Sequence, residues 1–365
     1  MGGLCSKQKK VVIRGLLLVA LGVLIITALL IVERFTNPSV HQLELTSTNV
    51  IIPDIKTHST FSKQAVLNPV PAEFQGTQGP GLGFARPTDL QIPPFDRPQT
   101  EEFELAEGIP FAPFLILLNR AEQPVTLLVV ALLDYEQVPF ELDDKTGLLH
   151  EVVVPSATEL NLPLHLQIAG AGMHDLALVA FVNPYSHPLD IDTRANELGN
   201  IVGRRTVVVV GEQKDPFKVL APVIVGEDPP PNLASIPIRV GLAAAPDKQL
   251  THPSERQIVL SEAHPAQEFP YQVWATNFNQ DVPVDYAMIG FLDFHQVDLS
   301  QPHVTVVNLG VGQEAIINAS VTMPDRTGIH EIQVIYMLDP YKSILQGQVA
   351  TPFIFSTPRL GVDTR

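Results

Sequence analysis

A stretch that occurs twice indicates the fold: it reads LDYEQV from Leu133 to Val138 and LDFHQV from Leu292 to Val297. A second pair follows in the same order, with GMHDL at 172–176 and GIHEI at 328–332. The copies lie 159 residues apart for the first pair and 156 residues apart for the second. Two blocks that keep their order at nearly one offset predict an internal repeat, and such a repeat constrains the whole fold.

Short apolar segments of strand length surround both copies, and clusters of turn residues separate them. Seven candidate strands lie between residues 103 and 210, which matches an immunoglobulin-like sandwich in number and size. A second set of candidate strands follows between 236 and 355. We therefore predict an all-β chain with two tandem immunoglobulin-like β-sandwiches. The first sandwich spans 101–222, a Pro-rich linker spans 223–234, the second sandwich spans 235–358, and a tail spans 359–365.

The composition excludes several classes of protein. The chain has 365 residues, of which 45% are hydrophobic, and a fully disordered chain has fewer apolar residues. Its 33 prolines argue against a mostly helical protein, because proline breaks helix interiors. The formal net charge of −16 argues against nucleic-acid binding, which needs clustered Lys and Arg. A single cysteine, Cys5, excludes an intrachain disulfide and a multi-cysteine metal site.

The N-terminus contains a long apolar segment at 15–32, with 18 residues and no charge. As a helix it would span about 27 Å, close to the hydrocarbon thickness of a bilayer. A cleaved signal peptide is the alternative, but its apolar region is shorter and ends in a small-residue cleavage site. Basic residues between positions 7 and 14 favour a cytoplasmic N-terminus. We predict a single-pass membrane protein with a cytoplasmic segment at 1–14, a transmembrane anchor at 15–34 and an extracytoplasmic remainder.

The segment that follows the anchor, residues 35–100, is rich in Pro and Gly and has no sustained hydrophobic period. We predict an extracytoplasmic tether there, with only local docking of residues 51–52 and 65–67 on the folded part. Its glycine-rich stretch at 76–83 lacks the Lys and the preceding strand of a phosphate-binding loop.

No combination of residues predicts catalysis, a cofactor or a metal. His174-Asp175 and His330-Glu331 recur at equivalent positions, but adjacent strand residues point to opposite faces of a sheet. We therefore expect each His to be hydrogen-bonded at the start of a strand rather than to bind a metal. Asp134 occupies the position in the first repeat that Asp293 occupies in the second, so we do not expect a catalytic pair. A loose calcium site in the acidic loop at 189–201 is an alternative, although this loop fails the EF-hand pattern.

The chain resembles bacterial membrane-anchored surface proteins that carry tandem immunoglobulin-like domains. The resemblance covers residues 102–357 and rests on strand spacing and on a penultimate strand that opens with Gly-x-His-[Asp/Glu]. The cysteine pair of antibody domains is absent, and the single Trp274 has no counterpart in the first repeat. The resemblance implies a sandwich fold at the superfamily level and a place in the cell envelope.

We expect a non-catalytic protein whose two sandwiches bind a protein or an envelope polymer, or support an envelope assembly. An accessory subunit of a membrane complex and an extracytoplasmic enzyme with a carboxylate site on its loops are the alternatives. Recognition is expected in exposed loops or at the junction of the two sandwiches, because loops on a rigid scaffold commonly bind partners. The loops at 185–200 and 341–347, after the Asx-Pro-Tyr turns, offer the most polar and aromatic groups. The candidate binding residues are Tyr185, Asp190, Asp192, Arg194, Tyr341 and Lys342. For Tyr185 and Tyr341, capping of their own sandwiches is the alternative that we favour.

Overall fold

The computed structural model of the chain describes residues 54–76, 79–93, 96–97, 102–187, 201–212, 215–218, 220–229, 240–244, 260–278, 281–341 and 354–365. These residues form strands in four sheets and two short 3₁₀-helices, η1 (Ala72–Phe74) and η2 (Pro87–Gln91). The predicted all-β class is therefore confirmed for the described residues.

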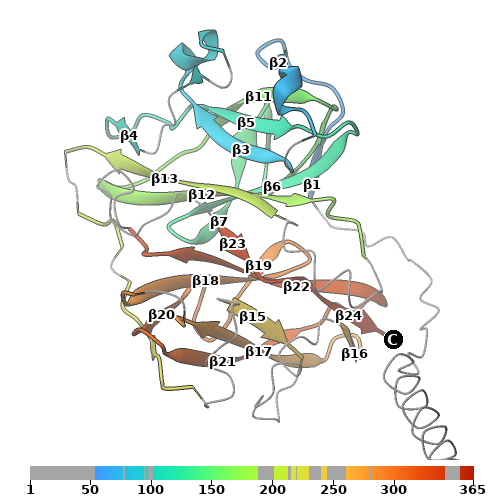
Figure 1. Ribbon diagram of the computed structural model, residues 1–365, viewed down its shortest axis with the longest axis vertical. Coiled ribbons are helices and arrows are strands. Elements are labelled where there is room, and N and C mark those ends of the chain that lie inside the picture. The colour runs from blue at the N-terminus through green and yellow to red at the C-terminus, as the bar shows by residue number, and fades with distance from the viewer. Residues whose placement is uncertain are drawn as a thin grey trace, which may run out of the picture. The chain divides into compact units, whose positions relative to one another are not determined.

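The first sandwich consists of two facing sheets (Figure 1). Its outer sheet contains β3 (Gly81–Ala85), β5 (Phe114–Asn119), β11 (Thr158–His165), β8 (Phe140–Leu142) and β9 (Lys145–Gly147), with β2 (Val66–Pro69) also paired to β11. Its inner sheet contains β1 (Ile55–His58), β10 (Leu149–Val154), β6 (Val125–Leu133), β12 (Gly172–Val182), β13 (Ile201–Val210) and β4 (Glu102–Leu105), with β7 (Glu136–Val138) paired to β6.

The second sandwich repeats this arrangement. Its inner sheet contains β14 (Ile224–Val225), β20 (Thr305–Leu309), β18 (Val284–Leu292), β22 (Gly328–Leu338), β24 (Leu360–Thr364) and β16 (Leu260–Ala263), with β19 (His295–Val297) paired to β18 and β23 (Phe355–Ser356) paired to β22. Its outer sheet contains β15 (Val240–Ala243), β17 (Glu268–Thr276) and β21 (Glu314–Thr322). The pairing of two facing sheets in each half agrees with the predicted immunoglobulin-like sandwich at the superfamily level.

The central strands of the two inner sheets, β6, β12, β18 and β22, are buried on both faces. In β6, Leu127 and Val129 face the core of the first sandwich, whereas Leu128 and Val130 belong to a separate apolar cluster. That cluster also includes side chains of β18 and β22, so it joins one inner sheet to the other. We call it the shared core, and its members include Leu128, Val130, Leu132, Phe181, Ala287, Ile289, Phe291 and Met337. A strand that is buried on both faces reads as a continuous apolar run, as VTLLVVALL does in β6.

Two glutamines make reciprocal hydrogen bonds at the rim of the shared core. The backbone N–H of Gln137 donates to Oε1 of Gln296 at 2.6 Å, and the backbone N–H of Gln296 donates to Oε1 of Gln137 at 2.8 Å. The side-chain Nε2 of Gln137 also donates to the carbonyl of Phe294, and the side-chain Nε2 of Gln296 donates to the carbonyl of Tyr135. The two repeats therefore meet as an isologous pair does, with each surface contacting its own equivalent.

The prediction of a tether is wrong for the described part of residues 35–100. β1 pairs in parallel with β10, β2 pairs with β11, and β3 pairs with β5. Arg97 also fixes this segment, because its guanidinium forms a 2.7 Å ion pair with the buried Glu159 of β11. These strands are only four or five residues long and are separated by Pro and Gly, so they lack a clear hydrophobic period.

The same reason explains two boundary errors in the second half. Residues 359–365 are not a tail, because β24 lies in the middle of the inner sheet between β22 and β16. Residues 223–229 of the predicted linker include β14, which pairs in parallel with β20 just as β1 pairs with β10. Each repeat thus begins with a short parallel strand that its sequence pattern does not reveal.

No helix in the described portion of the chain is long and apolar enough to cross a membrane. The predicted anchor at 15–34 lies outside the described residues.

The shared core makes a testable prediction about Phe181, whose ring centroid lies 5.7 Å from that of Phe291 and 4.7 Å from that of Phe294. Phe181→Ala should lower the free energy of unfolding by about 3–5 kcal/mol, because it opens a cavity between two buried sheets. Hydrogen exchange should show the loss in both inner sheets. Val153→Ala, at a side chain that is 44% exposed, is the control and should change stability by less than about 0.5 kcal/mol. A loss confined to the first sandwich would contradict the coupling.

Candidate functional site

The repeated sequence blocks contact each other in the first sandwich. Asp134 follows β6 in a turn with φ of +50°, and its Oδ2 lies 2.7 Å from Nδ1 of His174 near the start of β12. Its Oδ1 accepts the backbone N–H of Asp175 at 3.0 Å. β12 begins at Gly172, whose φ of +133° favours glycine, and a Cβ there would come within 3.2 Å of the Asp215 carbonyl. The Asp-His contact therefore fixes the end of one strand to the start of another.

The second sandwich contains the same contact. Nδ1 of His330 lies 2.6 Å from Oδ2 of Asp293, whose Oδ1 accepts the backbone N–H of Glu331 at 3.0 Å. Gly328 opens β22 with a φ of +134°. The expectation that each repeated His is hydrogen-bonded at a strand start is confirmed. Asp134 and Asp293 each bind the histidine of their own repeat.

Asp175 is the centre of a buried network between the two sandwiches. Its carboxylate accepts Nε of Arg205 at 2.5 Å, the phenol of Tyr135, and the backbone N–H of Tyr341 at 2.9 Å. Arg205 is fully buried, and its Nη1 donates to the carbonyl of Leu338 in the second sandwich at 2.9 Å. The network thus crosses from one repeat to the other at both ends.

The electrostatics of this network favour one charge arrangement. Burial, together with the Asp175 carboxylate, raises the pKa of Tyr135 far above its ordinary value. Burial likewise raises the pKa of Tyr341, with a further contribution from Asp134, whose Oδ1 accepts the Tyr341 phenol at 3.1 Å. Burial lowers the pKa of Arg205, but Asp175 together with Tyr135 and Asp339 outweighs this effect, so its pKa is raised. The result is an ion pair between Arg205 and Asp175 beside neutral phenols.

The opposite side of the junction has an equivalent set of contacts. By strand register Arg359 takes the place before β24 that Arg205 takes in β13, and its Nη1 donates to the carbonyl of Pro184 at 3.2 Å. Glu331, the equivalent of Asp175, lies 2.7 Å from Nδ1 of His187 in the first sandwich. Each repeat therefore places an arginine on a backbone carbonyl of the other.

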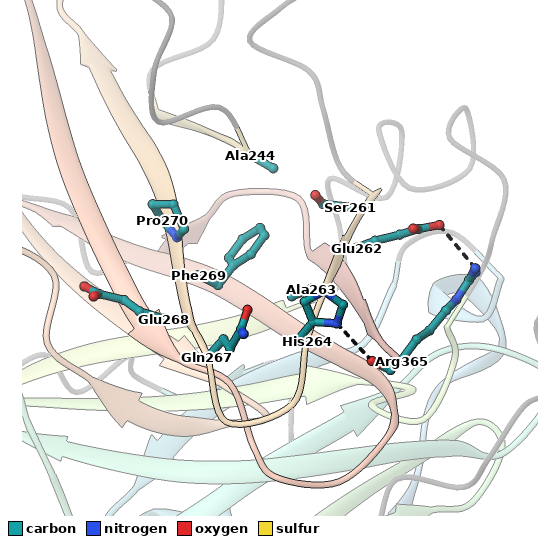
Figure 2. Close-up of a pocket in the computed structure, with 10 residues that line it drawn as sticks. All are labelled: Ala244, Ser261, Glu262, Ala263, His264, Gln267, Glu268, Phe269, Pro270 and Arg365. Carbon is teal, nitrogen blue, oxygen red and sulfur yellow. Dashed lines mark hydrogen bonds and ion pairs between the residues drawn. The ribbon is translucent and has the colours of Figure 1, made fainter.

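A pocket of about 380 Å³ lies away from this junction, between β16 and β17 (Figure 2). Phe269 and Pro270 contribute apolar surface, and Glu268 carries a carboxylate beside them. His264 contacts the carbonyl of Arg365 at 3.3 Å, and the Arg365 guanidinium lies 3.4 Å from Glu262. Such a pocket suits a small apolar group that carries a polar or cationic end.

The predicted binding residues lie in different environments. Tyr185 is 43% exposed, and its phenol donates to the carboxylate of Glu151. Burial, with this bond to Glu151, raises the pKa of Tyr185. Tyr341 is only 7% exposed, because it lies in the junction and its ring packs against Tyr135 with centroids 5.5 Å apart. The remaining candidates lie outside the described residues, and these are Asp190, Asp192, Arg194 and Lys342.

Sequence reasoning missed the residues that join the two sandwiches. Gln137 and Gln296 were visible as identical residues inside the repeated block, but nothing in the pattern showed that they contact each other. Neither Arg205 nor His187 lies in the repeated blocks, so the sequence pattern does not single them out. Within the described ranges, no group of three or more His, Cys, Asp or Glu could hold a metal ion. The alternative calcium loop lies almost entirely outside those ranges.

No family model matches the chain, and no curated protein matches it. Among solved structures it is similar to a CARDB domain from Pyrococcus furiosus at 11% identity and a TM-score of 0.22, over 34% of this chain and 92% of that one. It is also similar to CBD12 from CALX1.2 at 7% identity and a TM-score of 0.19, over 73% of this chain and 97% of that one. Red sea bream transglutaminase matches at 10% identity and a TM-score of 0.22, and the match covers 72% of this chain and 30% of that one. Scores this low carry no argument, so the fold rests on the strand pairing itself.

A buried histidine pair joins β1 to the first inner sheet. Nε2 of His58 lies 3.0 Å from Nδ1 of His150, and Nε2 of His150 lies 3.1 Å from the carbonyl of Phe140. Nε2 of His150 must therefore carry its proton, which leaves Nδ1 to accept from His58. Burial, followed by the neighbouring His58, lowers the pKa of His150 to about 4. Burial and then Lys145 lower the pKa of His58, against an opposing effect of Asp143.

The pair should make the protein less stable in mild acid. The unfolded chain binds protons on these rings below about pH 6.5, whereas folded His150 does so only near pH 4. Stability that is present above pH 6.5 is therefore lost as the pH falls toward 4, by an amount on the order of 3 kcal/mol. Urea unfolding at pH 7 and pH 4.5 should show a smaller loss for His150→Gln than for the wild type. His165→Gln, at a half-exposed side chain, is the control and should keep the wild-type loss. An unchanged pH dependence in His150→Gln would exclude the pair as its source.

Proposed function

We propose that the chain is a membrane-anchored, non-catalytic extracytoplasmic protein. Its two β-sandwiches act as one rigid body that binds a protein or an envelope polymer, or supports an envelope assembly. The observation that carries the proposal is the shared core, which fuses two inner sheets and closes the junction with the Arg205 and Arg359 contacts. A shared apolar interface of this kind favours fixed geometry over relative domain motion.

The proposal assigns binding to the surfaces that remain. Most side chains of the central strands of both inner sheets are buried in cores. The outer sheets, the sheet edges and the loops are therefore the surfaces that a partner can contact. The Asx-Pro-Tyr turns support this division, because one faces solvent through Tyr185 and the other fills the junction with Tyr341. The acidic balance of residues 36–365, with 38 Asp and Glu against 18 Lys and Arg, favours partners that are basic or neutral.

The membrane topology is directly testable. The basic cluster before residue 15 and the acidic remainder lead us to expect a cytoplasmic Met1 and an extracytoplasmic Arg365. Protease added to spheroplasts should remove an epitope placed after Arg365 and spare one placed at Met1. The reverse pattern of protection would overturn both the topology and the location.

The binding role is tested by comparing two tyrosines at equivalent positions. A photoreactive benzoylphenylalanine at Tyr185, which is 43% exposed, should give a discrete adduct with a partner in intact membranes. The same group at Tyr341, which is 7% exposed, should give no adduct with another molecule. If purified protein turns over a substrate, and one carboxylate substitution on its loops abolishes that activity, the non-catalytic proposal is wrong.

A further inference from the structure

The outer sheet of the second sandwich ends in a long edge strand. β21 pairs with β17 along its whole length, from Glu314 opposite Thr276 to Thr322 opposite Glu268. On its other side, Glu314 exchanges hydrogen bonds of 2.9 and 2.7 Å with Glu227, and among the described residues no other backbone partner lies along that side.

The direction of the free backbone groups follows from this contact. In an antiparallel ladder, alternate residues point both their N–H and their C=O away from a given neighbour. The backbone N–H and C=O of Glu314 point away from β17, because they bond to Glu227. The same therefore holds for the backbone groups of every second residue after it. These residues are Ile316, Asn318, Ser320 and Thr322, and no strand in the described part of the chain pairs with that side of them.

The first sandwich covers the equivalent edge completely. β11 corresponds to β21, and its outward residues Glu159 and Asn161 lie opposite β2. Further along, His165 lies opposite Glu141 of β8, and the carbonyl of Pro163 accepts the N–H of Asp143 at 2.9 Å. Both covering strands run antiparallel to β11.

The alignment of β11 with β21 rests on side-chain hydrogen bonds as well as on the order of the strands in each sheet. Asn119 at the end of β5 and Asn277 just after β17 donate equivalent side-chain bonds, to the carbonyls of Gln123 and Val282 respectively. Counting back along both ladders places Pro163 at the position of Asn318. The first sandwich thus has a proline, which lacks an N–H, where the second has a residue that keeps its donor.

The second sandwich has no counterpart of the β8–β9 hairpin between β19 and β20. In the first, residues 139–148 between β7 and β10 form the β8–β9 hairpin. In the second, the connection between β19 and β20 is only residues 298–304, too short for such a hairpin. Long unpaired edges are rare in stable proteins unless something pairs with them.

We propose that the outer edge of β21 binds an extended segment of another polypeptide, which adds to the sheet as an antiparallel strand. The direction follows from β2 and β8, which occupy the same edge in the first sandwich. Backbone hydrogen bonds from Ile316 to Thr322 supply the affinity. The segment bound is basic or neutral, because exposed Glu227 and Glu268 flank the edge and the chain carries a net charge of −16. The same charge disfavours a second copy of this chain.

This inference deepens the proposed binding function, and its failure is distinguishable from failure of that function. If photoadducts form at Tyr185 but the edge binds nothing, the binding role stands and the partner binds elsewhere.

The test uses a peptide with the sequence of residues 61–70, FSKQAVLNPV, which contains β2 and one Lys. Fluorescence anisotropy of the labelled peptide is measured with the full-length protein in detergent. Asn318→Pro should weaken binding about tenfold, since it removes an outward N–H and keeps the backbone bonds to β17. It also removes the side-chain bond from Gln272 to Asn318, which the alanine variant loses as well. Asn318→Ala is the matched control: it removes the side chain, keeps the N–H, and should bind within about twofold of wild type.

A second measurement does not depend on how the proline variant folds. Two versions of the peptide are N-methylated on alternate residues. One version is methylated on the amides that face β21, and the other on the amides that face away from it. Only the first version should lose binding to the wild-type protein. Equal binding by both sets, or by Asn318→Pro and wild type, would overturn the proposal. Slow hydrogen exchange at Asn318 in the protein alone would show that the chain covers its own edge. Loss of self-association in Asn318→Pro would identify a second copy as the occupant. Either result would also overturn it.

Discussion

The structure depends on one constraint, which is that each inner sheet must bury both of its faces. β6 and β18 are apolar on every side, so neither could face water without exposing a large hydrophobic surface. The two sheets pack on each other through the shared core. At its rim, the side-chain oxygens of Gln137 and Gln296 each accept the backbone N–H of the other residue. The remaining features, including the buried Arg205 and the division of roles between Tyr185 and Tyr341, follow from that contact.

The buried charges at the junction add specificity as well as attraction. An unpaired guanidinium inside protein is costly, so Arg205 holds its place only while Asp175 and the carbonyl of Leu338 are correctly positioned. Those two partners lie in different repeats. If the two sandwiches were displaced relative to each other, Arg205 would lose one of these partners and its buried charge would be unpaired. The apolar contacts alone would tolerate small displacements.

The sequence predicted the repeated elements well and their surroundings poorly. The LDYEQV and GMHDL blocks located β6, β7 and β12, because long strands with turn residues after them carry a clear pattern. β1 and β24 were missed, since a four- or five-residue strand beside Pro or Gly has too few positions to show a period. The sequence does not separate Tyr341 from Tyr185, because an Asx-Pro-Tyr turn has the same pattern whether it faces solvent or a second sandwich. The expectation that each strand buries one face is wrong for β6, whose apolar run fits burial on both faces but does not identify what covers the second one.

Covalent linkage of the two repeats changes the stoichiometry of recognition. Two identical subunits related by a two-fold axis would present every surface twice, and an open sheet edge on each would let a divalent partner link them into chains. Here the repeats have diverged within one polypeptide. β11 is covered by β2 and β8, whereas no strand among the described residues pairs with the outer side of β21. Of these two equivalent strands only β21 would be open to a partner, so that in the proposed mode each chain binds one strand there and then stops.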